Sequence, residues 1–338
     1  MGDGDGKGGG IGEFELIERY LAPLATHPGS VGLVDDAAVL TPPEGCDLVM
    51  TKDALAEGVH FLAEDHPSAI ARKALRVNLS DLAAKGARPL GYLLGLGLAP
   101  GWDEAWLADF CSGLEADQQA YDFPLLGGDT IKVAAGPVLS VTAIGTVPRA
   151  TAVRRFPARV GDHLYVTGTI GDAALGLALR FDPSKGEAWG LEEAERAHLL
   201  DRYLLPQPRT EGAEAVRCHA RACMDVSDGL VADLGKMLGA SGAGIGADVL
   251  LEAVPFSNAA QKAVEADPAA LVTALTGGDD YELLASVAPE DALAFEHAML
   301  SAGLHPSRIG TVREGAGVTY LKMGKRIAFA GSGGYTHF

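Results

Sequence analysis

Aspartates recur along this 338-residue chain beside glycine, serine or threonine, close to apolar runs. One such stretch, GLVDDAAVL (32–40), places Asp35 and Asp36 next to each other among apolar residues. A buried carboxylate without a partner costs several kcal/mol. This pair must therefore lie at the surface, serve a turn or cap, or hold a cation.

The same local pattern, an apolar run followed by one or two aspartates, occurs six times, and we interpret each case as the end of a strand. A single aspartate of this kind is typical of a helix cap, worth about 1 kcal/mol, and Asp81 and Asp228 fit that alternative. Strand ends on one edge of a sheet converge, however, and converging carboxylates repel each other unless cations neutralise them. Oxygen ligands without neighbouring His or Cys favour Mg²⁺, Mn²⁺ or Ca²⁺ over zinc. The aspartates are Asp35 and Asp36, Asp53, Asp81, Asp129, Asp225 and Asp228, and Asp279 and Asp280.

Glycines accompany the aspartates in LLGGDT (125–130), VTGTIGDAALG (166–176) and TGGDDY (276–281). Glycine lets backbone N–H groups approach phosphate oxygens, and a helix start favours an anion. Ordinary tight turns are the alternative for each segment. Together, the carboxylates and the glycines suggest a polyphosphate bridged to the protein by Mg²⁺. The chain has no GxxxxGK[ST] and no kinase HRD or DFG set, so neither P-loop nor protein-kinase chemistry is expected.

The composition narrows the class of partner. With 27 basic and 45 acidic residues the formal charge is −18, which argues against nucleic acid or an anionic membrane. No apolar run reaches the roughly 18–20 residues of a membrane span, and no leader indicates secretion. The four cysteines form no CxxC pair and suggest no disulfide framework. We expect a reduced, cytoplasmic protein.

The elements that must position these residues predict a mixed α/β chain of the α+β class with two domains. We expect a disordered glycine-rich start over 1–12, an N-terminal domain over 13–150 and a C-terminal domain over 151–338. The boundary lies in the basic, proline-containing segment 148–162. Apolar spacing predicts helices at 14–25, 68–87, 103–121, 172–181 and 291–303, and strands at 47–55, 89–99, 124–130, 136–147 and 163–169, with a strand, a turn and a helix over 222–242.

Several of these blocks, in this order, resemble the thiamine-monophosphate kinase family. That family belongs to a superfamily of ATP-using enzymes that includes aminoimidazole ribonucleotide synthetase and selenophosphate synthetase. The resemblance runs from Gly12 to Phe338, and the combination of VNLSDLAAKGA, DVSDGL and GGDDYEL is specific. The matching blocks are GEFELI, VDDAAVL, TKDALAEGVHF, KALRVNLSDLAAKGARP, LLGGDT, GDHLYVTGTIGDAALGL, MDVSDGLVADLG, TGGDDYELL and GGYTHF.

The resemblance implies an N-terminal domain that dimerises through its sheet, a C-terminal α/β domain, and a cleft between them for ATP and several Mg²⁺ ions. Residue by residue, it implies metal positions at Asp36, Thr51, Lys52, Asp53, Asp81, Asp129, Asp225 and Asp228. Nucleotide-contacting positions fall on Gly128, Asp129, Arg155 and Ser227. Positions near thiamine phosphate fall on His60, Asp279 and Tyr335. The chemistry would depend most on Asp81, Asp129 and Asp228.

Three positions depart from the family pattern. Val34 stands where glycine is usual, which makes the turn less permissive. Lys52 stands where Ser or Thr is usual, so only its main-chain carbonyl remains as a metal ligand and an ammonium would lie near the metals. Asp279 is one methylene shorter than the usual Glu, which could alter the fit of the substrate.

The implied reaction is ATP plus thiamine monophosphate giving ADP plus thiamine diphosphate in a homodimer. The acceptor phosphate oxygen is already anionic near pH 7, so no strong general base is needed. Bound Mg²⁺ would bridge the phosphates, with Asp81 and Asp129 as shared ligands, Arg155 as a positive fork and Tyr335 against the thiamine ring.

Three other functions compete with this interpretation. A selenophosphate-synthetase-like enzyme needs a reactive cysteine near the N-terminus, and no cysteine precedes Cys46. A non-catalytic protein that binds divalent cations predicts metal binding indifferent to nucleotide. An acidic oligomeric scaffold leaves the glycine loops unexplained.

Overall fold

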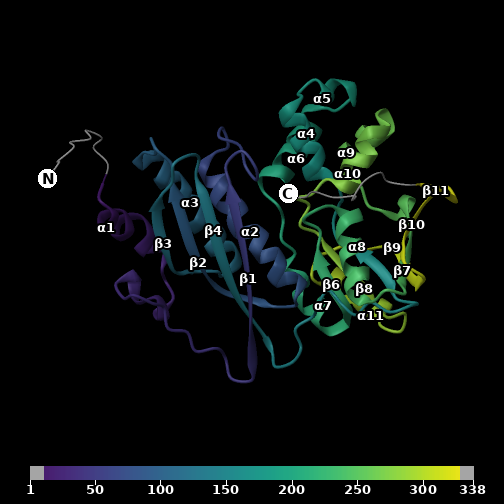
Figure 1. Ribbon diagram of the computed structural model, residues 1–338, viewed down its shortest axis with the longest axis horizontal. Coiled ribbons are helices and arrows are strands. Elements are labelled where there is room, and N and C mark those ends of the chain that lie inside the picture. Colours follow the sequence, from purple (N-terminus) through teal and green to yellow (C-terminus); the bar gives the residue numbers. More distant parts are fainter. Residues whose placement is uncertain (1–10, 328–338) are drawn as a thin grey trace. The chain divides into compact units, whose positions relative to one another are not determined.

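The computed structural model describes residues 11–327, which form two compact units (Figure 1). The first consists of residues 11–41, 52–75 and 90–143, and the second of residues 42–51, 76–89 and 144–327. The predicted start over 1–12 therefore lies mostly outside the described residues. The predicted boundary near residue 150, the dimer and the ATP cleft stay predictions.

The first half of the chain forms a four-stranded sheet in the order β1-β4-β2-β3. Its strands are β1 (Cys46–Ala56), β2 (Arg88–Leu98), β3 (Leu125–Lys132) and β4 (Val138–Pro148), and β2 and β3 are parallel. Short helical turns precede the sheet, and two long helices alternate with its strands. These are α1 (Glu13–Leu16), η1 (Ile17–Leu21), η2 (Ala22–Leu24), η3 (Pro28–Leu33), α2 (Pro67–Ala84) and α3 (Glu104–Tyr121).

Local chemistry explains where α3 begins and ends. The Asp103 carboxylate accepts the Trp106 N–H at 2.8 Å and so caps the helix start. Leu107, Phe110 and Leu114 recur at helical spacing and are fully buried. The helix then stops at Asp122, whose φ of 49° lies in the left-handed region.

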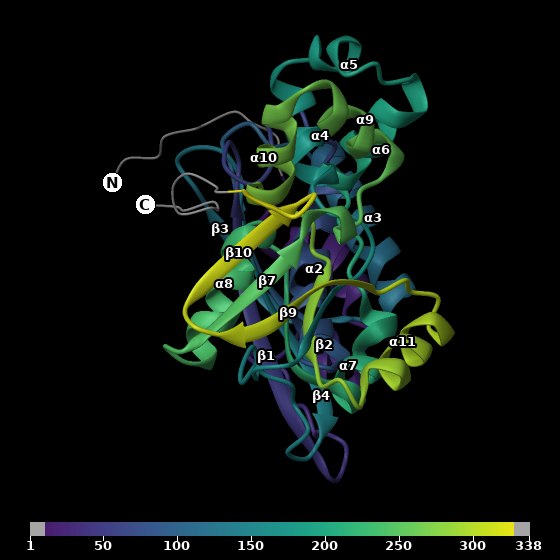
Figure 2. The ribbon, with the colours of Figure 1, turned by 90° about the vertical axis from the view of Figure 1, so that its right-hand side faces the viewer.

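The second unit contains a seven-stranded mixed sheet in the order β11-β10-β7-β9-β5-β8-β6, and Figure 2 shows β7, β9 and β10 side by side in it. Only the β7–β10 pair is parallel among its described pairings. The strands are β5 (His163–Val166), β6 (Ala220–Asp225), β7 (Ile245–Leu250), β8 (Leu283–Val287), β9 (Ser307–Glu314), β10 (Gly317–Lys322) and β11 (Lys325–Ile327). The helices are α4 (Asp172–Phe181), α5 (Lys185–Ala188), α6 (Glu193–Leu204), η4 (Thr210–Gly212), α7 (Ala213–His219), α8 (Leu230–Ser241), η5 (Leu251–Ala253), α9 (Asn258–Ala266), α10 (Pro268–Thr276) and α11 (Ala292–Ser301).

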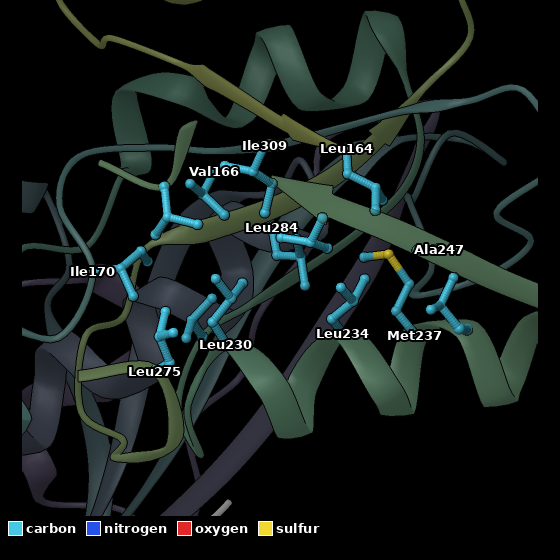
Figure 3. Packing of buried hydrophobic residues seen from close by; sticks show 14 of the residues in the cluster. Leu164, Val166, Ile170, Leu230, Leu234, Met237, Ala247, Leu275, Leu284 and Ile309 are labelled. Carbon is cyan, nitrogen blue, oxygen red and sulfur yellow. The ribbon is translucent and has the colours of Figure 1, made fainter. Parts of the chain in front are cut away.

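The main core of this unit lies between α8 and the sheet (Figure 3). Leu230, Leu234 and Met237 are spaced i, i+4, i+7 and point toward Leu164 and Leu284 on the strands. Full burial of each such side chain contributes about 1.5–3 kcal/mol. This packing fixes the start of α8, and with it the loop that follows β6.

The mixed α/β class is confirmed, and so are the predicted helices and most predicted strands. The strand expected within 32–40 is wrong, because residues 34–43 form no strand. Val31 and Leu33 have φ values of 50° and 62°, on either side of Gly32 at 62°, and such a left-handed run turns the chain instead of extending it. Among the described residues, no helix combines the length and the apolar character that a membrane crossing needs.

Candidate active site

One pocket of the first unit brings together several of the predicted residues. It has a volume of about 140 Å³. Its lining includes Asp36, Gly128 and Asp129 together with Asp35 and Glu13. Leucines and an isoleucine from η1, β2 and β3 complete its wall. Two predicted metal positions and a predicted nucleotide position therefore share one concave surface.

Asp129 reaches this pocket from within β3, which corrects the expectation that it follows the end of a strand. Its neighbour Gly128 pairs with Leu94 of β2. A Cβ on Gly128 would lie 1.9 Å from the Leu94 carbonyl oxygen, so only glycine permits this approach of the two strands. The glycine thus serves the sheet, and Asp129 is placed by strand geometry.

Asp35 and Asp36 lie in an exposed turn after η3. The Asp35 carboxylate accepts the backbone N–H of Asp36 at 2.8 Å. This bond stabilises the turn. Asp35 therefore serves the turn, and Asp36 is the member of the pair that remains the candidate ligand. Val34, the departure before them, is 83% exposed and so is not crowded.

Strand β1 carries three predicted metal positions. Asp53 lies inside β1 (Cys46–Ala56), not after its end. Side chains alternate along a strand, so Lys52 lies on the opposite face from Thr51 and Asp53. The Lys52 ammonium accordingly donates to Ser140 Oγ on β4. The ammonium thus lies on the opposite face of β1 from these two side chains, and the expectation that it lies near the metals stays a prediction.

His60 lies in the turn after β1, where its ring holds the backbone. Its Nδ1 accepts the Ala56 N–H at 3.1 Å, and its carbonyl accepts the Lys73 ammonium at 3.0 Å. The structure thus gives His60 a turn-forming role in addition to the predicted contact with substrate.

In the second unit, Asp81 and Asp225 form an acidic pair. Thr51 Oγ1 donates to Asp81 Oδ2 at 2.5 Å, and Ser80 Oγ donates to Asp225 Oδ2 at 2.7 Å. Burial, and then the nearby Asp81 carboxylate, raise the pKa of Asp225 above its ordinary value. A bound cation would relieve this destabilisation of the Asp225 carboxylate. Asp81 lies inside α2, so it neither ends a strand nor caps a helix.

Asp225 is the one aspartate of the six segments that closes a strand, and the loop after it is held by residues the sequence did not single out. Asp233, fully buried, accepts the N–H groups of Ser227 and Asp228 at 3.0 and 2.8 Å. Lys236 forms ion pairs with both Asp228 and Asp233. The expectation that Asp228 caps α8 is wrong, because Gly229 is the N-cap and no side chain caps there. The i, i+3 spacing of Asp233 and Lys236 could have indicated this pair.

The sequence predicted that the start of α4 would bind a phosphate. A carboxyl group of the chain itself lies there. Asp280 Oδ2 accepts the Gly171 N–H at 2.8 Å. The Gly171 N–H at this helix start therefore already has an acceptor within the chain, while the expected phosphate contact of segment 166–176 stays a prediction. Asp279 and Asp280 also precede β8 instead of following a strand.

The remaining predicted residues are placed as follows. Asp279 has a φ of 70° and donates its N–H to the Ser227 carbonyl at 2.9 Å. Arg155 is exposed, and no partner for its guanidinium exists within residues 11–327. Tyr335 lies outside the described residues. Over the same range, no three His, Cys, Asp or Glu side chains are grouped closely enough to hold a metal ion by themselves.

The chain matches two domains of one class of proteins. Residues 34–147 match the N-terminal domain of AIR synthase related proteins, and residues 159–321 match the C-terminal domain. The two matched domains thus place the chain in the AIR synthase related class.

Individual relatives narrow the class. The chain is 43% identical over 319 residues to the thiamine-monophosphate kinase of Caulobacter vibrioides. The aligned region covers 93% of this chain and 88% of that protein. It is 40% identical over 331 residues to the thiamine-monophosphate kinase of Salmonella typhimurium. That alignment covers 97% of this chain and 98% of the relative. The crystal structure of thiamine-monophosphate kinase from Stenotrophomonas maltophilia K279a superposes with a TM-score of 0.81 at 39% identity, over 92% and 96% of the two chains. AaThiL complexed with AMPPCP and TMP superposes with a TM-score of 0.74 at 32% identity, over 92% and 97%.

The chain therefore belongs to the thiamine-monophosphate kinase family and is a phosphotransferase. The predicted resemblance is confirmed.

Proposed function

We propose that this enzyme transfers the γ-phosphoryl group of ATP to thiamine monophosphate, giving ADP and thiamine diphosphate. The observation that carries the proposal, beside family membership, is the pocket in which Asp36, Gly128 and Asp129 lie together. The acceptor oxygen is anionic near pH 7, so the protein need only align two polyanions and offset their charge.

We propose Mg²⁺ as the cofactor, and the donor set fits it because every side-chain donor is a hard oxygen. The Asp81 carboxylate, together with burial, disfavours the charged form of Asp225, which supports a cation at that pair. When bound, Mg²⁺ offsets the charge of the transferring phosphoryl group. The residues that would hold it are Asp36, Asp53 and Asp129 from the first unit, and Thr51, Asp81, Asp225 and Asp228 from the second, with the carbonyl of Lys52.

The other predicted residues would bind and orient the substrates. The exposed guanidinium of Arg155 would pair with phosphate oxygens in a bidentate fashion. Ser227 and Gly128 would bring backbone groups to the nucleotide. His60, Asp279 and Tyr335 would lie against thiamine monophosphate.

We further propose a homodimer in the cytoplasm. Leu93, Ile131 and Val138, on three strands of the four-stranded sheet, are 37%, 54% and 39% exposed, which supports an apolar contact through this sheet. The four cysteines are free thiols, which suits a reducing compartment. Light scattering at micromolar concentration would give twice the 34.9 kDa chain mass if the dimer forms.

A product assay tests the function. Purified enzyme is incubated with ATP, Mg²⁺ and thiamine monophosphate, and thiamine diphosphate is measured by mass spectrometry, with thiamine as acceptor and chelated metal as controls. We expect metal-dependent formation of thiamine diphosphate from the monophosphate alone. Failure to form it while ATP still binds would refute the substrate.

A binding experiment separates this enzyme from a protein that merely binds cations. Calorimetry with a non-hydrolysable ATP analogue, with and without Mg²⁺, should show that metal and nucleotide strengthen each other's binding. Independent binding of the two would contradict the kinase function.

A further inference from the structure

We propose that Asp280 is a positioning residue, which fixes the 277–282 loop between the start of α4 and the loop after β6 and thereby sets the direction of Asp279. This inference rests on the proposed function, since it concerns how Asp279 meets thiamine monophosphate. Asp280 itself lies too deep to touch a substrate, because it is 8% exposed.

The first support is the contact between Asp280 and α4. Its Oδ2 accepts the Gly171 N–H at 2.8 Å, from a residue 109 positions earlier in the chain. Its Oδ1 is buried and has no hydrogen-bond partner among the described residues. A buried oxygen without a partner costs free energy, so a structural role has to account for it.

The second support is the backbone bonding of the loop to residues 226 and 227. Asp279 N–H donates to the Ser227 carbonyl at 2.9 Å, and Tyr281 N–H donates to the Val226 carbonyl at 2.8 Å. Val226 N–H in turn donates to the Glu282 carbonyl at 2.8 Å. A Cβ on Gly278 would lie 2.1 Å from the Ser227 carbonyl oxygen, so glycine is required for this approach.

The third support is the conformation on both sides of Asp280. Asp279 and Tyr281 have φ values of 70° and 52°, which non-glycine residues adopt only when other contacts enforce them. The Tyr281 hydroxyl donates to Asp279 Oδ1 at 3.4 Å. Glu282, the next buried acid, forms an ion pair with Arg209. Asp280, which is held by Gly171, thus lies between two residues whose backbone conformation and side-chain direction depend on this contact.

An uncharged variant of Asp280 distinguishes positioning from direct contact. Burial raises the pKa of Asp280 well above the ordinary value of an aspartate, which disfavours the charged form. An asparagine can accept the same Gly171 N–H without a charge. Positioning therefore survives Asp280→Asn and fails in Asp280→Ala.

Steady-state kinetics on the full-length enzyme test the proposal. In Asp280→Ala we expect the KM for thiamine monophosphate to rise about tenfold or more and the KM for ATP to change less than twofold. In Asp280→Asn we expect both KM values to lie within about threefold of wild type. The matched control is Asp172→Asn. Asp172 is also buried at the same helix start but bonds to Thr169, Ser257 and His198 instead of the loop. It should leave both KM values unchanged.

Two outcomes would overturn the proposal. One is Asp280→Ala with both KM values unchanged. The other is a loss in Asp280→Asn as large as that in Asp279→Asn, because it would mean that a charged carboxylate is used directly. If Asp280→Ala does not fold, the asparagine variant alone decides between these roles. A wild-type enzyme that forms no thiamine diphosphate would refute the proposed function instead, so the two failures are distinguishable.

Discussion

The ammonium of Lys236 forms an ion pair with the carboxylate of Asp228, a residue we propose as a metal ligand. The same ammonium contacts Asp233 Oδ1 at 2.7 Å, while Asp233 Oδ2 holds the backbone of the loop. The Lys236 ammonium therefore already offsets the charge of the Asp228 carboxylate. A divalent cation bound by Asp228 would compete with this ammonium.

Lys236→Met should strengthen binding of a divalent cation. Half-exposed pairs are worth about 0.2–1 kcal/mol, so we expect Mn²⁺ affinity to rise about two- to fivefold by calorimetry. Lys262→Met, which removes a comparable ion pair with Glu195, is the control and should leave the affinity unchanged. Weaker Mn²⁺ binding in Lys236→Met would show that the ammonium does not compete with the ion.

Asp81→Asn should abolish most of the activity without unfolding the protein. Loss of one ligand to a metal that offsets phosphoryl charge costs several kcal/mol of transition-state stabilisation, or about 100-fold or more in kcat. Thermal unfolding should stay within a few degrees of wild type. Asp201→Asn, on the exposed side of α6, provides the control. Retained activity in Asp81→Asn would remove Asp81 from the site.

Gly128→Ala should destabilise the enzyme far more than Gly127→Ala. The Cβ of the first would meet a backbone carbonyl at 1.9 Å, whereas that of the second would meet the movable end of Leu93 at 3.3 Å. Overpacking of this kind costs about 1–3 kcal/mol. Urea unfolding of both variants measures the difference, and equal midpoints would contradict the described β2–β3 approach.

The stability of the enzyme should fall with rising pH through the contribution of Asp280. Burial raises its pKa in the folded state, so unfolding releases a proton between the ordinary pKa near 4 and the folded one. The contribution is complete below the unfolded pKa and is lost as pH rises toward the folded pKa, by up to about 1.4 kcal/mol per pH unit. Asp280→Asn should flatten the urea-unfolding free energy between pH 5 and 8. Parallel curves for the two proteins would refute this titration.

Apolar periodicity predicted most helices and strands, because the buried faces of α3 and α8 are encoded in neighbouring residues. It could not place the aspartates correctly. Asp53 and Asp129 lie inside strands that are only partly buried, so polar and apolar residues follow each other as they would at a strand end. Asp81 lies in a helix that also buries polar residues, so the spacing of apolar residues alone does not show which face of that helix is buried.

The contacts that hold the site could not be predicted locally. Asp280 bonds to a residue more than a hundred positions away, and Asp225 bonds to Ser80 across 145 positions. Each depends on strand pairing and helix packing that no short segment specifies. The resemblance to a family supplied the proposed site residues where spacing could not.

Position 52 shows how one strand residue can serve two tasks. We propose its main-chain carbonyl as a metal ligand, and a carbonyl does not depend on the side chain of its residue. Because the pleat of β1 directs the Lys52 side chain toward Ser140, the ammonium lies on the opposite face from Asp53. The side chain at this position can therefore serve the contact with β4 while the backbone serves the proposed ligand.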